Sequence, residues 1–305
     1  RSSSRNASKD SKMPSYRMFF TRLSEVDATY KSLIMITLEQ FQEKCKHDSK
    51  EEIMEKNRKF SWIRKVLIGL AISIMIAAGA FFWYVNDYYQ ATVEAVEALQ
   101  SDESITVTET DDTITFTPNG KDPEEGVIFY PGGKVEAEAY APLLRSLAEA
   151  DLLVVIAKMP FHLAVFDADA AEAIMEQEVS VQDWYLAGHS LGGVMASSFA
   201  ADQTDRVDGL IFLASYPSND LTDAPFSALS IYGSEDEVLS RESYDKAQAK
   251  LPDDYTEIVL DGGNHGQFGD YGLQEGDGTA TISALQQQQQ TVEAITAFIG
   301  NSHQQ

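Results

Sequence analysis

The sequence predicts an α/β protein with a mainly parallel sheet flanked by helices, preceded by one transmembrane helix. Two observations support this fold class. From about residue 126 onward, short apolar runs typical of buried strands alternate with helical patterns, an arrangement that gives right-handed crossovers and a mainly parallel sheet. Well before them lies a single run of 20 residues without a charge, Val66–Val85.

The strand pattern begins with a hairpin, because residues 105–110 and 113–117 alternate apolar and polar residues around Asp111-Asp112. Further strands are expected at 126–130, 152–157, 184–187, 210–213, 228–232 and 256–260, and helices at 137–150, 164–177, 191–201, 241–251 and 284–299. The five glutamines Gln286–Gln290 fall within the last helix, and we interpret them as its solvent-exposed face. The folded domain is therefore predicted over residues 103–300.

The charge is distributed unevenly along the chain. Residues 1–85 hold 15 Lys and Arg against 9 Asp and Glu, a net charge of +6, whereas residues 86–305 hold 8 against 39, a net charge of −31. So acidic a domain repels phosphate backbones, which argues against nucleic acid as a partner.

The uncharged run at 66–85 is long enough to cross a bilayer as a helix. Trp62 precedes it, and Trp83, Tyr84 and two further tyrosines lie at its other end, where aromatic side chains favour the membrane interface. A buried core helix and a signal peptide cleaved near Ala78-Gly79-Ala80 are the alternatives. Cleavage there would leave four aromatic residues exposed at the new N-terminus, which favours an uncleaved anchor.

Basic residues before the span and acidic residues after it predict the orientation, with the N-terminus in the cytoplasm and the acidic domain outside the cell membrane. Residues 1–65 are accordingly predicted to be a poorly ordered cytoplasmic segment. Residues 86–102 are predicted to be a stalk, helical over 86–100 because Ala91, Val93, Val96 and Leu99 follow an apolar pattern.

The chemical signal begins at Gly188-His189-Ser190-Leu191-Gly192, which matches G-x-S-x-G between a predicted strand and a predicted helix. That context predicts a sharp turn with Ser190 as nucleophile at a helix N-terminus. The amide of Leu191 is expected to form one half of an oxyanion hole. The other half is expected from the loop after strand 126–130, with Gly133 as the best candidate.

A serine nucleophile needs a base and an acid, which follow it along the chain in the order acid, then histidine. Downstream of the serine only His265 and His303 are available, and His265 lies in a loop directly after the last predicted strand. Asp236 follows the preceding strand in the pattern G-x-x-D-x-V and is the expected acid, with Glu235 and Glu237 as alternatives. No cofactor or metal is expected.

These motifs, in this order, resemble the α/β-hydrolase superfamily over about residues 103–300, and most closely its small, membrane-anchored bacterial serine hydrolases. The resemblance implies an esterase-like or lipase-like activity on a small-molecule acyl substrate. Pro131-Gly132-Gly133 departs from the His-Gly-x that many members carry, which leaves the second oxyanion donor open. An acyltransferase with the same three residues, or a binding protein that keeps the fold without turnover, are the alternatives.

The loop between the strands at 210–213 and 228–232 is too short for the helical cap found in many members, so an open site is expected. Loops at the carboxyl ends of the strands then shape the pocket. Phe161 and His162 after one strand, and Phe268 after His265, are the candidate substrate-binding residues.

Overall fold

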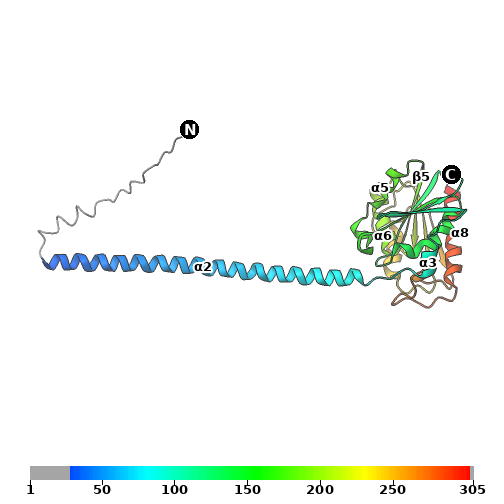
Figure 1. Cartoon of the computed structure of the whole chain (residues 1–305). Coiled ribbons are helices and arrows are strands. Elements are labelled where there is room, and N and C mark those ends of the chain that lie inside the picture. Colours follow the sequence, from blue (N-terminus) through cyan, green and yellow to red (C-terminus); the bar gives the residue numbers. More distant parts are fainter. Residues whose placement is uncertain (1–27, 303–305) are drawn as a thin grey trace, which may run out of the picture. The chain divides into compact units, whose positions relative to one another are not determined.

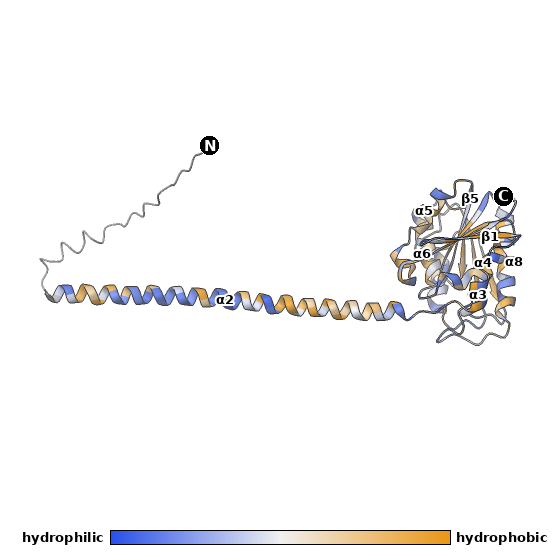
Figure 2. Ribbon diagram, viewed as in Figure 1, coloured by the Kyte–Doolittle hydropathy of each residue, from blue (hydrophilic) through white to orange (hydrophobic). Residues whose placement is uncertain are grey.

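The computed structural model describes residues 28–302, and the chain divides into two compact units, Arg1–Gly79 and Ala80–Gln305. One long helix, α2 (Ala28–Asn86), contains the apolar run and continues into the second unit (Figure 1). Among the described helices it is the one long and apolar enough to cross a membrane, with a mean hydropathy of 2.3 over its most apolar window. None of that window is buried, unlike the core helix of a soluble protein. Figure 2 shows the apolar residues gathered toward the C-terminal end of α2.

The helix corrects the prediction that residues 1–65 are poorly ordered, because residues 28–65 are helical. This segment contains neither glycine nor proline and is rich in residues with high helix propensity. Side chains one turn apart also pair, as Glu55 does with Lys59 at 2.9 Å. The predicted part at residues 1–27 lies outside the described residues.

The predicted helical stalk at 86–100 is also wrong, because α2 ends at Asn86, α3 (Val93–Glu97) is the only helix over residues 87–100, and the segment packs on the folded domain. Tyr89 forms a parallel bridge with Val135, and Ala95 is fully buried, whereas Val93 and Val96 of the expected apolar face are exposed. Backbone pairing by Tyr89 has replaced helical hydrogen bonds, so this segment forms a strap against the domain.

The domain contains one eight-stranded sheet in the order β1-β2-β4-β3-β5-β6-β7-β8 (Figure 1). The strands are β1 (Ile105–Glu109), β2 (Thr113–Pro118), β3 (Glu125–Tyr130), β4 (Leu153–Ala157), β5 (Asp183–His189), β6 (Gly209–Leu213), β7 (Ser227–Gly233) and β8 (Tyr255–Leu260). β2 pairs antiparallel with β1 and β4, and the remaining pairs are parallel. This confirms the predicted hairpin and the mainly parallel sheet.

Helices cover both faces of the sheet and create two cores. They are α4 (Ala141–Ala148), α5 (Ala170–Gln177), α6 (Leu191–Asp202), α7 (Arg241–Ala247) and α8 (Ala284–Ser302). Successive strand residues point to opposite faces. In β3, Val127 and Phe129 pack in a core with side chains of α4 and α8, whereas Ile128 and Tyr130 pack with those of α5 and α6. A strand buried on both faces must be continuously apolar, as β3 is from Gly126 to Tyr130.

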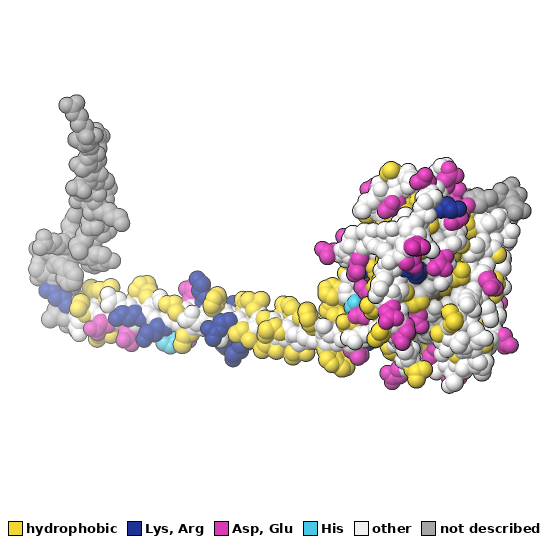
Figure 3. All heavy atoms as spheres, turned by 45° about the vertical axis from the view of Figure 1, so that its right-hand side comes forward, with side chains coloured by type: hydrophobic (Ala, Val, Ile, Leu, Met, Phe, Trp, Pro, Cys, Tyr) yellow, Lys and Arg dark blue, Asp and Glu magenta, His cyan; other side chains and the backbone are white. Residues whose placement is uncertain are grey.

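The surface of the domain carries its acidic charge, since Asp and Glu side chains are scattered over the face visible in Figure 3. The glutamine run is not the solvated face that was predicted: Gln287 is fully buried and Gln288 nearly so, while Gln289 and Gln290 are exposed. No cap domain lies between β6 and β7, which are joined by residues 214–226 alone.

Candidate active site

Ser190 occupies a sharp turn between β5 and α6 at the carboxyl edge of the sheet. Its backbone angles, φ 51° and ψ −122°, are unfavourable for a residue with a side chain, and such strain is typical of functional turns. Its N–H donates to the carbonyl of Leu213 at 2.9 Å, and its carbonyl accepts from the Ser215 hydroxyl at 2.6 Å. The neighbouring strand β6 and its following loop therefore hold the turn from the side.

Glycines around the turn permit a close approach of backbone segments. A Cβ atom at Gly188 would collide with the backbone of Gly193, and one at Gly192 would collide with the carbonyl oxygens of Tyr130 and Pro131. The N-terminus of α6 thus packs directly on the loop that follows β3, which brings the two predicted halves of the oxyanion hole together.

His265 and Asp236 lie in contact, as the sequence predicted. Nδ1 of His265 is 2.9 Å from Oδ2 of Asp236, and both side chains are almost completely buried. Oδ1 of Asp236 accepts from the amides of Val238 and Leu239, which fixes the carboxylate. The alternatives Glu235 and Glu237 are exposed to solvent.

The second ring nitrogen of His265, Nε2, is buried without a hydrogen-bond partner among the described residues. Because Nδ1 donates a hydrogen bond to Asp236 and so keeps its proton, Nε2 of the neutral ring is left as the unprotonated acceptor. Ser190 and His265 line one pocket of about 250 Å³, together with Leu191, Val194 and Tyr216. The structure therefore brings serine and histidine to one pocket, with no hydrogen bond between them.

His189, which the sequence did not single out, joins three parts of the site. Its Nε2 lies 3.1 Å from the carbonyl oxygen of His265, which can only accept, so Nε2 carries the proton. Its Nδ1 then accepts from the Tyr140 hydroxyl at 2.8 Å, and that hydroxyl oxygen accepts from the amide of Gly132 at 3.0 Å. Burial, reinforced by the neighbouring His265, holds the pKa of His189 well below its usual value of 6.5, so the ring is neutral.

The loop after β3 has one free amide. Gly132 donates to Tyr140 and Lys134 donates to the carbonyl of His162 at 2.7 Å, whereas the Gly133 amide has no acceptor within residues 28–302. A Cβ atom at Gly133 would meet Cδ2 of Leu191 at 2.9 Å, so the two residues predicted for the oxyanion hole are neighbours. The amide of Leu191 is at the start of α6, where backbone N–H groups have no helical acceptor.

The three residues predicted to bind substrate do not line the pocket at Ser190. Phe268 is fully buried, packs against the ring of His189 and does not line the pocket at Ser190. Phe161 and His162 do not line the pocket at Ser190, and His162 borders a separate space of about 80 Å³. The pocket is lined instead by residues that were not predicted from the sequence, including Val194, Tyr216 and Leu239.

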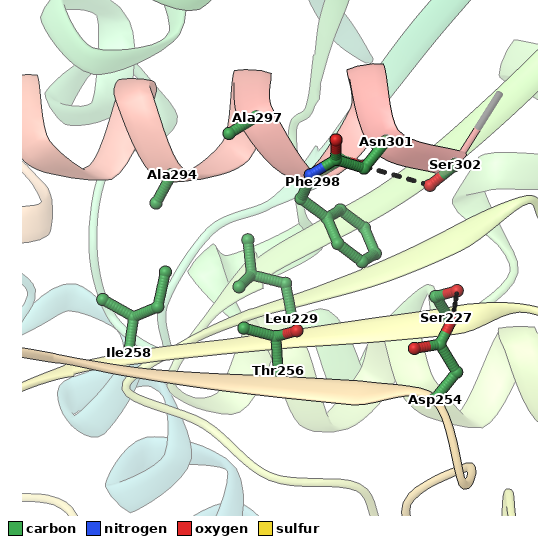
Figure 4. Close-up of a pocket in the computed structure, with 10 residues that line it drawn as sticks. All are labelled: Ser227, Leu229, Asp254, Thr256, Ile258, Ala294, Ala297, Phe298, Asn301 and Ser302. Carbon is green, nitrogen blue, oxygen red and sulfur yellow. Dashed lines mark hydrogen bonds between the residues drawn. The ribbon is translucent and has the colours of Figure 1, made fainter. Parts of the chain in front are cut away.

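A larger pocket of about 470 Å³ lies far from this chemistry, where β7 and β8 begin and α8 ends (Figure 4). Ser227 and Asp254 bond to each other there at 2.5 Å, and Phe298 forms part of the wall. Its ten lining residues include no histidine or cysteine. Over the described part of the chain, no group of three or more His, Cys, Asp or Glu side chains is arranged to hold a metal ion.

Comparisons with known proteins agree with this architecture. Est1E from Butyrivibrio proteoclasticus is 14% identical, with a TM-score of 0.50 over 67% of this chain and 100% of that one. A protein from Thermoplasma acidophilum described as a predicted CIB-like hydrolase is 13% identical, with a TM-score of 0.49 over 64% of this chain and 100% of that one. No curated protein matches the sequence significantly. The family model of the alpha/beta hydrolase family matches residues 126–289, more than half of the chain, which therefore belongs to this family.

Proposed function

We propose that the chain is a serine hydrolase that cleaves carboxylic esters or related acyl compounds, with Ser190 as nucleophile, His265 as base and Asp236 as acid. Family membership supports hydrolase activity. The observation that carries the finer proposal is the state of His265: Nδ1 is bound to Asp236, while Nε2 is buried, unpartnered and at the pocket that Ser190 also lines.

In the first step, Nε2 of His265 takes the proton of the Ser190 hydroxyl as its oxygen attacks the acyl carbon. The new C–O bond leaves a negative charge on the former carbonyl oxygen. The amides of Gly133 and Leu191 would stabilise this charge, since neither has an acceptor among the described residues and the two residues are neighbours. The Asp236 carboxylate steadies the positive charge on the imidazolium ring.

In the second step, the intermediate collapses, and the leaving alcohol departs with the proton from His265. This leaves an acyl group on Ser190. Water then attacks the acyl-enzyme, and His265 again takes and returns the proton, so that the acid is released and the serine restored.

Labelling with a fluorophosphonate probe and turnover of p-nitrophenyl esters of several chain lengths test the proposal. Ser190→Ala should lose labelling, and its kcat should fall by several orders of magnitude. Ser198→Ala is the matched control, because it removes another serine of α6 that is partly exposed. Labelling or turnover that persists in Ser190→Ala would refute the assignment. Free acid as product indicates hydrolysis, and an acylated acceptor indicates acyl transfer.

We also propose that residues 66–85 cross the cell membrane once, with the domain on the outer side. The length and hydropathy of α2 support a span, and the basic residues before it support the orientation. The full chain should then fractionate with membranes, and protease added to intact cells should digest the domain. Recovery from the soluble cytosol would exclude both points, and a secreted product beginning at Phe81 would indicate a cleaved signal peptide.

A further inference from the structure

Three aromatic rings and a valine form an apolar cluster at the surface of the second unit, here called the Phe81 face: Phe81, Phe161, Val165 and Phe166. The three rings meet edge to face, with centroids 5.5 Å apart for Phe81 and Phe161, 5.9 Å for Phe81 and Phe166, and 5.6 Å for Phe161 and Phe166. Yet Phe161, Val165 and Phe166 are each about half exposed, at 49%, 49% and 51%. Two half-exposed aromatic rings that contact each other and Phe81 suggest a partner.

The loop that carries Phe161, Val165 and Phe166 is held in an unusual conformation. Phe161 and His162 both have positive φ angles, of 56° and 55°, which are disfavoured for bulky residues. The ring of His162 packs on the ring of Tyr88, with the ring centroids 4.1 Å apart. The backbone carbonyl of His162 accepts from the Lys134 amide at 2.7 Å. The strap and the loop after β3 therefore fix a backbone turn that displays Phe161 outward.

The same loop borders the candidate active site. The 3-10 helix η4 (Ala164–Phe166) packs on α6, which contributes Val194 to the pocket at Ser190. A Cβ atom at Gly133 would lie 3.7 Å from the Leu163 side chain, so the loop also contacts the predicted oxyanion loop. The Phe81 face is thus linked to the pocket through α6 and to the predicted oxyanion loop through Leu163.

We propose that the Phe81 face rests in the interfacial layer of the lipid bilayer and holds the Ser190 pocket at the lipid–water boundary, where it takes ester-bearing amphiphiles from the membrane. The occupant is argued from continuity: Phe81 lies within the proposed span, at the aromatic end that also contains Trp83 and Tyr84. Phe161 and Phe166 contact Phe81 directly, so all three rings lie at about the same depth in the bilayer. The docking of this face rests on the proposed membrane span, and the substrate class rests on the proposed ester hydrolysis.

The strong negative charge of residues 86–305 makes apolar contact the available means of docking, because anionic lipid repels an acidic surface. Zwitterionic phosphatidylcholine vesicles are therefore the appropriate probe.

Cys45, the one cysteine of the chain, is replaced by serine so that a single new cysteine can carry an environment-sensitive fluorophore. The full chain is reconstituted with Val165→Cys, which leaves all three rings in place. Val179→Cys is the matched control, an exposed valine between α5 and β5. Ile74→Cys, within the apolar run, reports the span itself.

Phosphatidylcholine that carries a spin label near its headgroup should quench the fluorophore at position 165 at least about twofold more than that at 179, as expected for a surface that enters the headgroup layer. Equal, weak quenching at 165 and 179 with strong quenching at 74 by a spin label on the acyl chain would overturn the inference and leave the span intact. A label at 165 that is shielded from water but not quenched by lipid would mean a protein partner or a second copy, and would also overturn it. Without quenching at 74 the proposed span fails, and the inference with it, while probe labelling of Ser190 would be unaffected.

Discussion

Gln287 holds the backbone of Asn264 from both sides. Its Oε1 accepts from the Asn264 amide at 2.9 Å, and its Nε2 donates to the Asn264 carbonyl at 2.8 Å. The glutamine is fully buried, and Asn264 precedes the proposed base, His265. α8 thereby fixes the position from which His265 enters the pocket.

Gln287→Ala leaves a buried N–H and a buried C=O without partners. We expect the free energy of unfolding to fall by about 1–3 kcal/mol, and kcat to fall with the displacement of His265. Gln289→Ala is the control, since Gln289 is exposed on the same helix and its loss should change stability by less than about 0.5 kcal/mol. Urea unfolding of the full chain in detergent measures both variants. Equal stabilities would show that the paired hydrogen bonds contribute nothing.

Asp236→Asn tests the acid. The asparagine keeps the shape of the side chain but cannot steady an imidazolium, and it favours the wrong tautomer of His265. We expect kcat to fall by roughly 10³–10⁴, by analogy with serine proteases. Glu237→Gln alters an exposed carboxylate one position away and should change kcat by less than about tenfold. If Glu237→Gln is the damaged enzyme, the acid is misassigned.

Sequence reasoning succeeded where a signal is local. The turn at Ser190 shows itself through two glycines within a few residues, and the strand-and-helix alternation gives the parallel sheet. It failed where a contact joins distant segments. His189 binds Tyr140, 49 residues before it, and the carbonyl of His265, 76 residues after it, and no local pattern reports either partner.

The same reason explains two further errors. Residues 86–100 have an apolar pattern that suits a helix, but the backbone of Tyr89 pairs with the loop at Val135, and this tertiary contact overrides the local preference. A glutamine within a helix is ordinarily solvated. Gln287 is buried because its side-chain amide makes the hydrogen bonds that the Asn264 backbone N–H and C=O need.

Gly192→Ala tests the close packing at the turn. The new methyl group would collide with the carbonyl oxygens of Tyr130 and Pro131, which are backbone atoms and cannot rotate away. We expect a loss of at least about 1–3 kcal/mol of stability, as overpacking typically gives, together with loss of activity. Gly300→Ala in α8 is the matched control: nothing lies within 4 Å of its added carbon, and alanine favours a helix by up to about 1 kcal/mol. Thermal unfolding of the two variants should move in opposite directions.

His189 predicts how stability depends on pH. Burial and the neighbouring His265 hold its pKa well below 6.5 in the folded chain, whereas in the unfolded chain the pKa returns to about that value. Below pH 6.5 His189 therefore binds a proton in the unfolded chain but stays neutral in the folded chain. His189 makes its full contribution to the free energy of unfolding above pH 6.5. As the pH falls from 6.5 toward the pKa of the folded state, this contribution decreases by up to about 1.4 kcal/mol per pH unit.

His189→Gln removes the titrating group, so this part of the pH dependence should vanish. The variant should be less stable than the natural chain at pH 7.5, because glutamine cannot reproduce both bonds, to Tyr140 and to the carbonyl of His265. The difference in unfolding free energy between the two proteins should then shrink between pH 6.5 and pH 5, because only the natural chain loses stability through this group. Other titrating groups are common to both proteins and cancel in the difference. Urea unfolding at a series of pH values measures it. A difference that grows as the pH falls would mean that His189 is protonated in the folded protein, which would reverse the direction of the hydrogen bond from Tyr140.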